Sequence, residues 1–435
     1  MRESGRRRPS RTSRRTARRP ARPIVHSTAS ADLPRRALRT TVRSSSGAVA
    51  STRGGSLRMN LHRSRDSVQS SALWSTGAVD YPFLIAVCTL LAFGLLMLFS
   101  ASNARAYSSF GDSLWYFKRQ LMGVILGGAA MYGLSRVNYR RIDGKIALLL
   151  LFGSIFLLVL VIIPGVGTTT NGATRWLFGF QPSETAKLAI IVFFAHSLSK
   201  NQQNLKYFGK GFLPYIGILL IYIVLLALEP HFSCIILITF SSMLILFVAG
   251  AKIKHFLMIG IPGAIGAVAM VLVEPYRLAR VTSFLNPFAD AQGDGWQIVQ
   301  SLYAIGSGGL FGVGLGKSRQ KYLSLPEPQN DFIFSVLAEE LGLVGAILVI
   351  GLFIFLIIRG IKIAAKAPDL FGTLLVTGII GIVAFQALIN IAVVTSSIPV
   401  TGMPLPFFSY GSSALIITMA EMGIVLNVSR QRSIV

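Results

Sequence analysis

Long apolar blocks constrain this chain more than any other feature of its sequence. Several of them run to about 16–22 residues with few or no charges, the length of a helix that crosses a hydrocarbon core of about 30 Å. Hydrophobic residues make up 52% of the 435 residues and charged residues only 14%. A soluble enzyme, a disulfide-stapled secreted domain and a nucleic-acid-binding domain are therefore excluded as descriptions of the whole chain. We predict an all-α polytopic membrane protein.

The apolar segments and the charges between them predict a topology. We expect ten transmembrane helices, with a long loop, residues 275–330, between the seventh and the eighth. Basic residues favour cytoplasmic loops, and with the N-terminus inside, every predicted inner loop holds lysine or arginine. Both termini are therefore expected in the cytoplasm and loop 275–330 outside the membrane. The ten segments are residues 82–101, 120–135, 146–164, 184–199, 213–228, 232–249, 255–274, 331–357, 371–396 and 409–429.

The N-terminal region, residues 1–75, differs from the rest in composition. Residues 1–66 contain 18 arginines, no lysine and three acidic residues, so they carry +15 of the formal net charge of +25. Few large apolar residues are available there to offset the entropy lost on ordering. We interpret residues 1–75 as a disordered, Arg/Ser-rich cytoplasmic tail and residues 78–430 as the membrane domain. Binding to anionic lipid headgroups or an acidic partner, and a transit peptide, are alternative interpretations of the tail.

Loop 275–330 is longer than most connections and contains several aromatic residues, so we expect it to be functional rather than disordered. It includes a glycine-dense run, residues 306–316, and glycine permits tight turns and close approach of the backbone to a ligand. Gly316, Lys317 and Ser318 resemble the end of a phosphate-binding loop. That motif requires glycine at the position of Phe311, so a phosphate loop is excluded.

Asp331 lies where this loop meets the eighth apolar segment. A carboxylate there can be partly desolvated, which raises its pKa and suits it to act as a general base. The alternative is structural, because Asp is also a good helix N-cap. Glu339 and Glu340 follow about two turns deeper in the segment, and acids inside a membrane indicate a functional site or a buried polar network.

Basic residues on the predicted outer side could hold a phosphate or pyrophosphate group. Lys321 and Arg319 are the first candidates because they closely precede Asp331 in the sequence. Arg280 and Arg175 are second-rank candidates. The alternative for each of these residues is snorkelling at a helix end.

Glu184 and Lys187 are three residues apart, so they share one face of a helix. We interpret them as a structural ion pair, because a paired charge is cheaper to place in a membrane than a single one. The two cysteines, Cys88 and Cys234, lie in apolar segments and form no metal-site pattern. We predict no metal ligands and identify no cofactor, although a divalent cation, Mg²⁺ or Mn²⁺, stays compatible with the sequence.

A series of short motifs runs through the membrane domain. They are NGATRW at 171–176, QPSETAK at 181–187, EPHF at 229–232, AIGSGGLFG at 304–312, QK at 320–321, LPEPQNDFIF at 325–334 and PLPFFSYGSS at 404–413. Together they resemble the SEDS family, named for shape, elongation, division and sporulation, over residues 78–430. The segment Tyr276–Phe288 is more similar to the FtsW division branch than to the RodA elongation branch.

The resemblance implies a peptidoglycan glycosyltransferase that polymerises lipid II, an undecaprenyl-pyrophosphate-linked disaccharide peptide, at the outer face of the bacterial cytoplasmic membrane. The family's catalytic aspartate falls on Asp331 and its paired Glu and Lys fall on Glu184 and Lys187. Gln320, in one of the matching motifs, joins the basic residues as a substrate-binding candidate. The resemblance also implies action at the division septum, with a class B penicillin-binding protein and other divisome membrane proteins as partners and no nucleic acid.

Three other functions stay open at this point. They are an elongation-type, RodA-like polymerase, a lipid II flippase, and a non-catalytic division scaffold. A transporter often contains an internal repeat, and the two halves of this chain show no convincing one. Asn330, Ser397 and Ser412 depart from the family pattern, but the first of these changes leaves the carboxylate of Asp331 intact.

Overall fold

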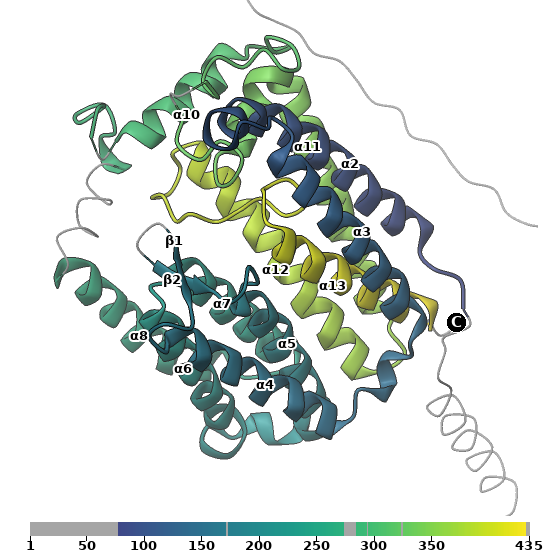
Figure 1. The fold of residues 1–435 in the computed structure, drawn as a ribbon. Coiled ribbons are helices and arrows are strands. Elements are labelled where there is room, and N and C mark those ends of the chain that lie inside the picture. Colours follow the sequence, from purple (N-terminus) through teal and green to yellow (C-terminus); the bar gives the residue numbers. More distant parts are fainter. Residues whose placement is uncertain (1–76, 171–172, 274–283, 294, 323–324, 432–435) are drawn as a thin grey trace, which may run out of the picture. The chain divides into compact units, whose positions relative to one another are not determined.

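The computed structural model describes residues 77–170, 173–273, 284–293, 295–322 and 325–431. The tail predicted over residues 1–75 and the candidate Arg280 lie outside the described residues. Within them the chain is mostly α-helical, as predicted (Figure 1). The helices are α2 (Tyr81–Phe110), α3 (Trp115–Arg136), α4 (Gly144–Ile162), α5 (Pro182–Asn201), α6 (Leu213–Leu228), α7 (Phe232–Val248), α8 (Ile253–Val273), α10 (Trp296–Ser307), α11 (Ile333–Ala365), α12 (Leu370–Val394) and α13 (Ser412–Arg430).

Shorter elements connect these helices. A 3-10 turn, η1 (Tyr139–Arg141), precedes α4, and η2 (Gln202–Lys206) and η3 (Phe208–Phe212) lead from α5 into α6. Between α4 and α5, β1 (Thr168–Thr170) and β2 (Ala173–Trp176) form a two-stranded antiparallel sheet.

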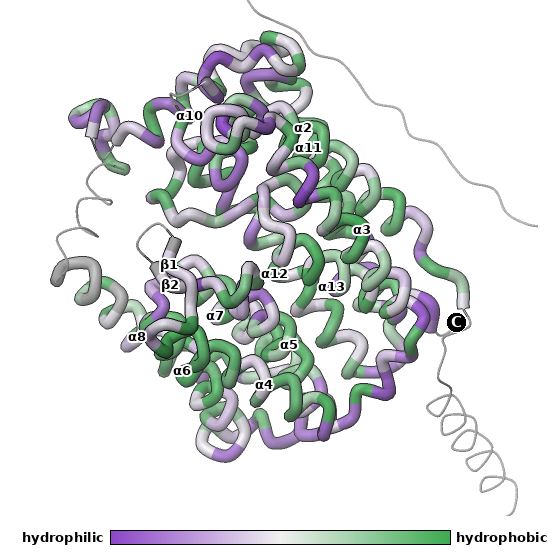
Figure 2. The backbone as a smooth tube through the Cα atoms, viewed as in Figure 1, coloured by the Kyte–Doolittle hydropathy of each residue, from purple (hydrophilic) through white to green (hydrophobic). Residues whose placement is uncertain are grey.

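Each of the ten predicted apolar segments overlaps one of these helices. Among the described residues, six helices are long and apolar enough to cross a membrane: α2, α4, α6 extended back to Phe208, α11, α12 and α13. Hydrophobic residues follow the helices and hydrophilic ones gather near many of their ends (Figure 2). A polytopic all-α membrane protein is therefore confirmed, whereas the count of ten spans stays a prediction.

Helix α5 shows why composition alone does not identify every span. It packs against α4, α7 and α12, and most of its residues are buried. Its charged residues Glu184 and Lys187 therefore contact protein rather than lipid. A helix enclosed by other helices does not need the uniformly apolar surface that lipid demands.

Helix α11 is interrupted at Gly342, whose backbone has a φ of 68° and a ψ of −168°. The glycine run of residues 306–316 fills this break. The N–H groups of Val313 and Gly314 donate to the carbonyls of Glu339 and Glu340, which end the first part of the helix. Conversely, the N–H groups that begin the second part, at 343 and 344, donate to carbonyls at 309 and 310. The break leaves these four polar groups satisfied by protein, as a membrane interior requires.

Close contact explains the glycines of this run. An added Cβ at Gly312 would overlap the carbonyl oxygen of Glu340, and one at Gly342 would overlap the amide nitrogen of Gly312. The density of glycine predicted that the backbone of this run comes close to another group. In the structure that group is the backbone of α11. Within the predicted loop 275–330, α10 also packs against α11 and α12.

Candidate active site

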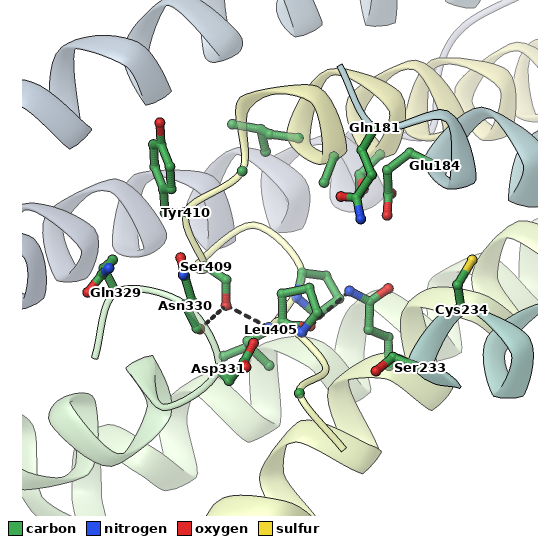
Figure 3. Close-up of a pocket in the computed structure, with 18 of the residues that line it drawn as sticks. Gln181, Glu184, Ser233, Cys234, Gln329, Asn330, Asp331, Leu405, Ser409 and Tyr410 are labelled. Atoms are coloured by element: carbon green, nitrogen blue, oxygen red, sulfur yellow. Dashed lines mark hydrogen bonds between the residues drawn. The ribbon is translucent and has the colours of Figure 1, made fainter. Parts of the chain in front are cut away.

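One cavity of about 460 Å³ brings together segments that are far apart in the sequence (Figure 3). Its walls come from the helices α3, α5, α7, α12 and α13, from β2 and the α6–α7 turn, and from the segments before α11 and between α12 and α13. Asp331, Arg175, Glu184 and Lys187 all line it. The structure thus places the predicted catalytic aspartate, one predicted basic residue and the predicted ion pair around a single space.

Asp331 lies in a turn that leads into α11 and is partly exposed. The N-cap position of α11 falls on Phe332, so Asp331 precedes the position that the capping alternative requires. The backbone of the turn is held from two sides. Asn390 of α12 donates through Nδ2 to the carbonyl oxygens of Asp331 at 2.8 Å and Met403 at 2.7 Å. Ser409 donates through Oγ to the carbonyl oxygen of residue 330 at 2.6 Å, as Figure 3 shows.

Glu327 organises the same turn through its side chain. It pairs with Arg105 of α2 at 2.6 Å, and it accepts hydrogen bonds from Gln329 at 3.0 Å and Asn330 at 2.8 Å. Glu327 also lines the cavity. Its carboxylate accepts from three donors and so holds the turn to α2 in this structure.

Glu184 and Lys187 form a buried ion pair, with 2.8 Å between Oε2 and Nζ. A lysine whose charge is matched this closely offers little net charge to a ligand. Glu421 of α13 is also buried, and its Oε1 has no hydrogen-bond partner among the described residues. Glu421 lies within electrostatic reach of Glu184 and Lys187. The sequence around Glu421 gives no signal that would have predicted this proximity.

Arg175 reaches the cavity from β2. Its Nε donates to the carbonyl oxygen of Glu229 at 3.3 Å, and its Nη2 donates to the carbonyl oxygen of Pro230. The guanidinium is close enough to interact electrostatically with the side chains of both Glu229 and Asp331. Among the basic residues that were predicted to bind substrate and that the structure describes, only Arg175 lines the cavity.

Lys321 and Arg319 are placed elsewhere. Lys321 is buried, with its Nζ 2.8 Å from Glu340 Oε1 and 3.0 Å from Ser100 Oγ, and Arg319 is exposed. Ser100 also donates to both carboxylate oxygens of Glu340 at 2.7 Å. The structure therefore does not bring Lys321 or Arg319 to the cavity beside Asp331, although they are close in sequence. Substrate binding by Arg319, Gln320 and Lys321 stays a prediction. Their positions outside this cavity do not favour it.

Burial changes the titration of two groups in the α6–α7 turn. It raises the pKa of the Glu229 carboxyl to about 7, an effect that the Arg175 guanidinium opposes. Burial, together with the positive charges of Arg175 and Lys187, lowers the pKa of His231 to about 3. Glu229 therefore titrates near neutral pH, while His231 is neutral there.

Aromatic side chains form another part of the wall. Trp115, Tyr116 and Tyr410 line the cavity, with the rings of Tyr116 and Tyr410 in edge contact at 4.7 Å. The Arg119 guanidinium covers the ring of Trp115 at 4.0 Å. Such rings can pack against apolar faces of a ligand. The described residues contain no group of three or more His, Cys, Asp or Glu side chains that could hold a metal ion.

The residues that match known sequences coincide with the helical domain. A family model described as a cell cycle protein, for FtsW, RodA and SpoVE, matches residues 81–434. Stage V sporulation protein E of Bacillus subtilis (strain 168) is 47% identical over 357 residues, covering 81% of this chain and 97% of that protein. A probable peptidoglycan glycosyltransferase FtsW of Trichlorobacter lovleyi is 42% identical over 354 residues, covering 80% of this chain and 93% of the relative.

Solved structures also resemble this fold. One chain comes from work described as "Structural coordination of polymerization and crosslinking by a peptidoglycan synthase complex", with a TM-score of 0.68 and 31% identity. The match covers 81% of this chain and 98% of that one. The rod shape determining protein RodA of Thermus thermophilus matches with a TM-score of 0.60 and 29% identity, covering 82% of this chain and 98% of RodA.

Proposed function

We propose that this chain, which belongs to the family of FtsW, RodA and SpoVE, is a peptidoglycan glycosyltransferase that polymerises lipid II into glycan strands. The family membership predicted from the sequence motifs is confirmed by these matches. The observation that carries the proposal is that Asp331 and Arg175 line one cavity. A base and a cation in the same space are what this reaction needs.

The chemistry assigns a role to each of the two residues. A sugar hydroxyl of one substrate attacks the anomeric carbon of the other, a carbon–oxygen bond forms, and the bond to the lipid pyrophosphate breaks. The hydroxyl is a weak nucleophile, so Asp331 takes its proton as general base, which typically contributes about 10²–10⁴-fold. Negative charge develops on the departing pyrophosphate, and Arg175 stabilises it.

The candidates for the pyrophosphate subsite differ in whether they line the cavity and in whether a carboxylate already pairs with them. Arg175 becomes the first candidate because it lines the cavity and its side chain donates to main-chain carbonyls rather than to a carboxylate. Lys187 is matched by Glu184 and Lys321 is matched by Glu340. Arg280, outside the described residues, stays a candidate on its sequence position alone. No step is assigned to Mg²⁺ or Mn²⁺, although a divalent cation stays compatible with the sequence.

The proposal includes a membrane arrangement. Ten spans cross the bacterial cytoplasmic membrane, both termini and the tail of residues 1–75 are cytoplasmic, and loop 275–330 is outside. The positive-inside pattern supports this, since every loop predicted to lie inside contains lysine or arginine. The cavity-forming ends of α3, α5, α11 and α13 then face the outer leaflet, where lipid II is consumed.

A class B penicillin-binding protein is the proposed partner, together with other divisome membrane proteins at the division septum. The similarity to a chain from a peptidoglycan synthase complex supports a cross-linking partner, and the FtsW relatives support the division branch. The alternative placement is with the elongation machinery, which the RodA similarity keeps open.

The decisive experiment is polymerisation of lipid II by the purified full-length chain, alone and with a class B penicillin-binding protein. Glycan strands from a catalytically intact chain, in the presence of a transpeptidase inhibitor, are the expected product. A flippase would move labelled lipid II across vesicles without making polymer, and a scaffold would do neither. Either of these two results would contradict the proposed function.

A further inference from the structure

The turn between α6 and α7 holds a carboxylate to which the proposed reaction assigns no role. Glu229 is only 2% exposed, and neither of its carboxylate oxygens has a hydrogen-bond partner among the described residues. The neighbouring guanidinium of Arg175 donates instead to the main-chain carbonyls of Glu229 and Pro230. A cation that lines the cavity is therefore anchored beside a buried acid that it does not bind directly.

An ionised carboxylate without hydrogen bonds is costly to bury, so such a group tends to take up a proton instead. The turn itself is well held, because the N–H groups of Glu229 and His231 donate to carbonyls of α6 at 3.2 and 2.9 Å. The carboxylate is thus kept in its buried position by the backbone. Because the backbone hydrogen bonds of the turn do not involve the carboxylate, it can gain or lose a proton while the turn keeps its structure.

Few other charges face this site. Glu184 and Lys187 of α5 neutralise each other at 2.8 Å, and His231 is neutral near neutral pH. Cys234 of α7 lies within electrostatic reach of Arg175, as does Asp331 before α11. The segment between α12 and α13, which forms the opposite wall, contains no charged residue. The charge around Arg175 therefore depends mainly on whether Asp331 and Glu229 are ionised.

We propose that Glu229 sets the charge that an anionic substrate group meets at Arg175, and so acts as a proton-controlled regulator of substrate binding. The inference rests on the proposed function, because it takes the pyrophosphate of the lipid-linked substrate as the anion. With Glu229 protonated, the positive charge of Arg175 is available to the pyrophosphate oxygens. With Glu229 ionised, its negative charge offsets that of Arg175 and repels the same oxygens.

The direction of the pH dependence follows from this arrangement. Burial raises the pKa of Glu229 to about 7, so its charge changes between pH 6 and pH 8. The pyrophosphate diester of the substrate keeps its full negative charge over this range. Binding should therefore be strong below pH 7 and weaken as the pH rises. By linkage, an anion that binds only the protonated form loses about tenfold in affinity between pH 6 and pH 8.

The test measures the KM for lipid II at pH 6, 7 and 8 with the purified full-length chain, under the conditions in which it polymerises. KM is compared between variants that all keep Asp331, so a difference in the pH dependence of KM reports the charge of Glu229 rather than that of Asp331. The variants are Glu229→Gln, which cannot ionise, and Glu229→Asp, which can. Asp112→Asn is the matched control, since Asp112 is an exposed carboxylate that pairs with Lys118 and does not line the cavity.

In the wild type, in Glu229→Asp and in the Asp112 control, KM should rise severalfold up to about tenfold from pH 6 to pH 8. In Glu229→Gln it should stay near its pH 6 value throughout. A KM for Glu229→Gln that rises as in the wild type would overturn the inference, and so would a wild-type KM that does not change with pH. Polymerisation that is absent from the wild type at every pH would instead refute the proposed function and the inference with it.

Discussion

Two clusters of charged residues, one at the break in α11 and one around the cavity, differ in how well their polar atoms are satisfied. In the break cluster, made of Ser100, Lys321, Glu339 and Glu340, every carboxylate oxygen accepts at least one hydrogen bond. In the cavity cluster, made of Arg175, Glu184, Lys187, Glu229, His231 and Asp331, both carboxylate oxygens of Glu229 and Nδ1 of His231 have no hydrogen-bond partner among the described residues.

We infer from this difference that the break cluster is structural and that the cavity cluster is functional. A fully satisfied buried network stabilises one arrangement, and the break cluster joins α2 to the interrupted helix α11 in this way. The carboxylate of Glu229 is instead buried without partners, so its charge influences the cavity through Arg175 and without direct contact with a ligand. Charge content alone does not make this distinction, since both clusters contain lysine or arginine together with glutamate.

The largest expected effect lies in the cavity cluster. Asp331→Asn keeps the shape of the side chain but removes the base, so polymerisation should fall by about 10²–10⁴-fold. Lipid II binding and thermal stability should stay close to those of the wild type, which binding and melting measurements would check. Near-normal polymerisation would show that Asp331 is not the base, and Glu327 would be the next carboxylate to change.

A change in the break cluster should affect stability instead. Lys321→Met leaves Glu340 buried without its cation, which should cost about 3–5 kcal/mol in the free energy of unfolding. Removing both charges, by Lys321→Met together with Glu340→Gln, should cost less than the single change. Thermal unfolding in detergent measures both. If Lys321→Met melts normally but raises the KM for lipid II, Lys321 binds substrate and the contrast between the two clusters is wrong.

The glycine run beside the break cluster offers a matched pair of substitutions. Gly312 and Gly316 have the same φ of 79°, but only at Gly312 would an added Cβ overlap another group, the carbonyl oxygen of Glu340. Gly316→Ala should therefore show only the cost of a left-handed backbone, about 1–2 kcal/mol. Gly312→Ala should be clearly less stable in the same melting experiment. Equal losses would mean that the run does not pack tightly into the break of α11.

The smallest effect is expected where the backbone of the catalytic turn is held. Asn390→Ala removes two hydrogen bonds, to the carbonyls of Asp331 and Met403, each of which contributes about 0.5–1.5 kcal/mol. Because Asp331 would be less well positioned, kcat should fall while the KM for lipid II changes little. Asn390→Leu, which is close to Asn in size but cannot donate, should behave like the alanine variant. A raised KM with unchanged kcat would indicate contact with substrate instead.

Hydropathy predicted the positions of the apolar helices well, because lipid imposes the same demand on every exposed helix. The boundaries of α6 match those expected, and those of α7 differ by a single residue. The demand weakens where protein replaces lipid, which is why α5 carries a buried ion pair and is less apolar than most of the other helices. Asp331 could also be selected as a candidate from the sequence, because a carboxylate at the junction of a polar loop and an apolar helix is unusual.

The sequence by itself determined the helical membrane fold and the family, and it proposed Asp331 as the base, because each of these follows from local composition or from a motif. Only the tertiary structure decided which charge meets which. Lys321 is ten residues from Asp331 along the chain but pairs with Glu340, whereas Arg175, from a distant hairpin, shares its cavity. The physical reason is that a charge buried in a membrane protein takes its nearest partner in space, and helix packing chooses that partner without regard to sequence distance.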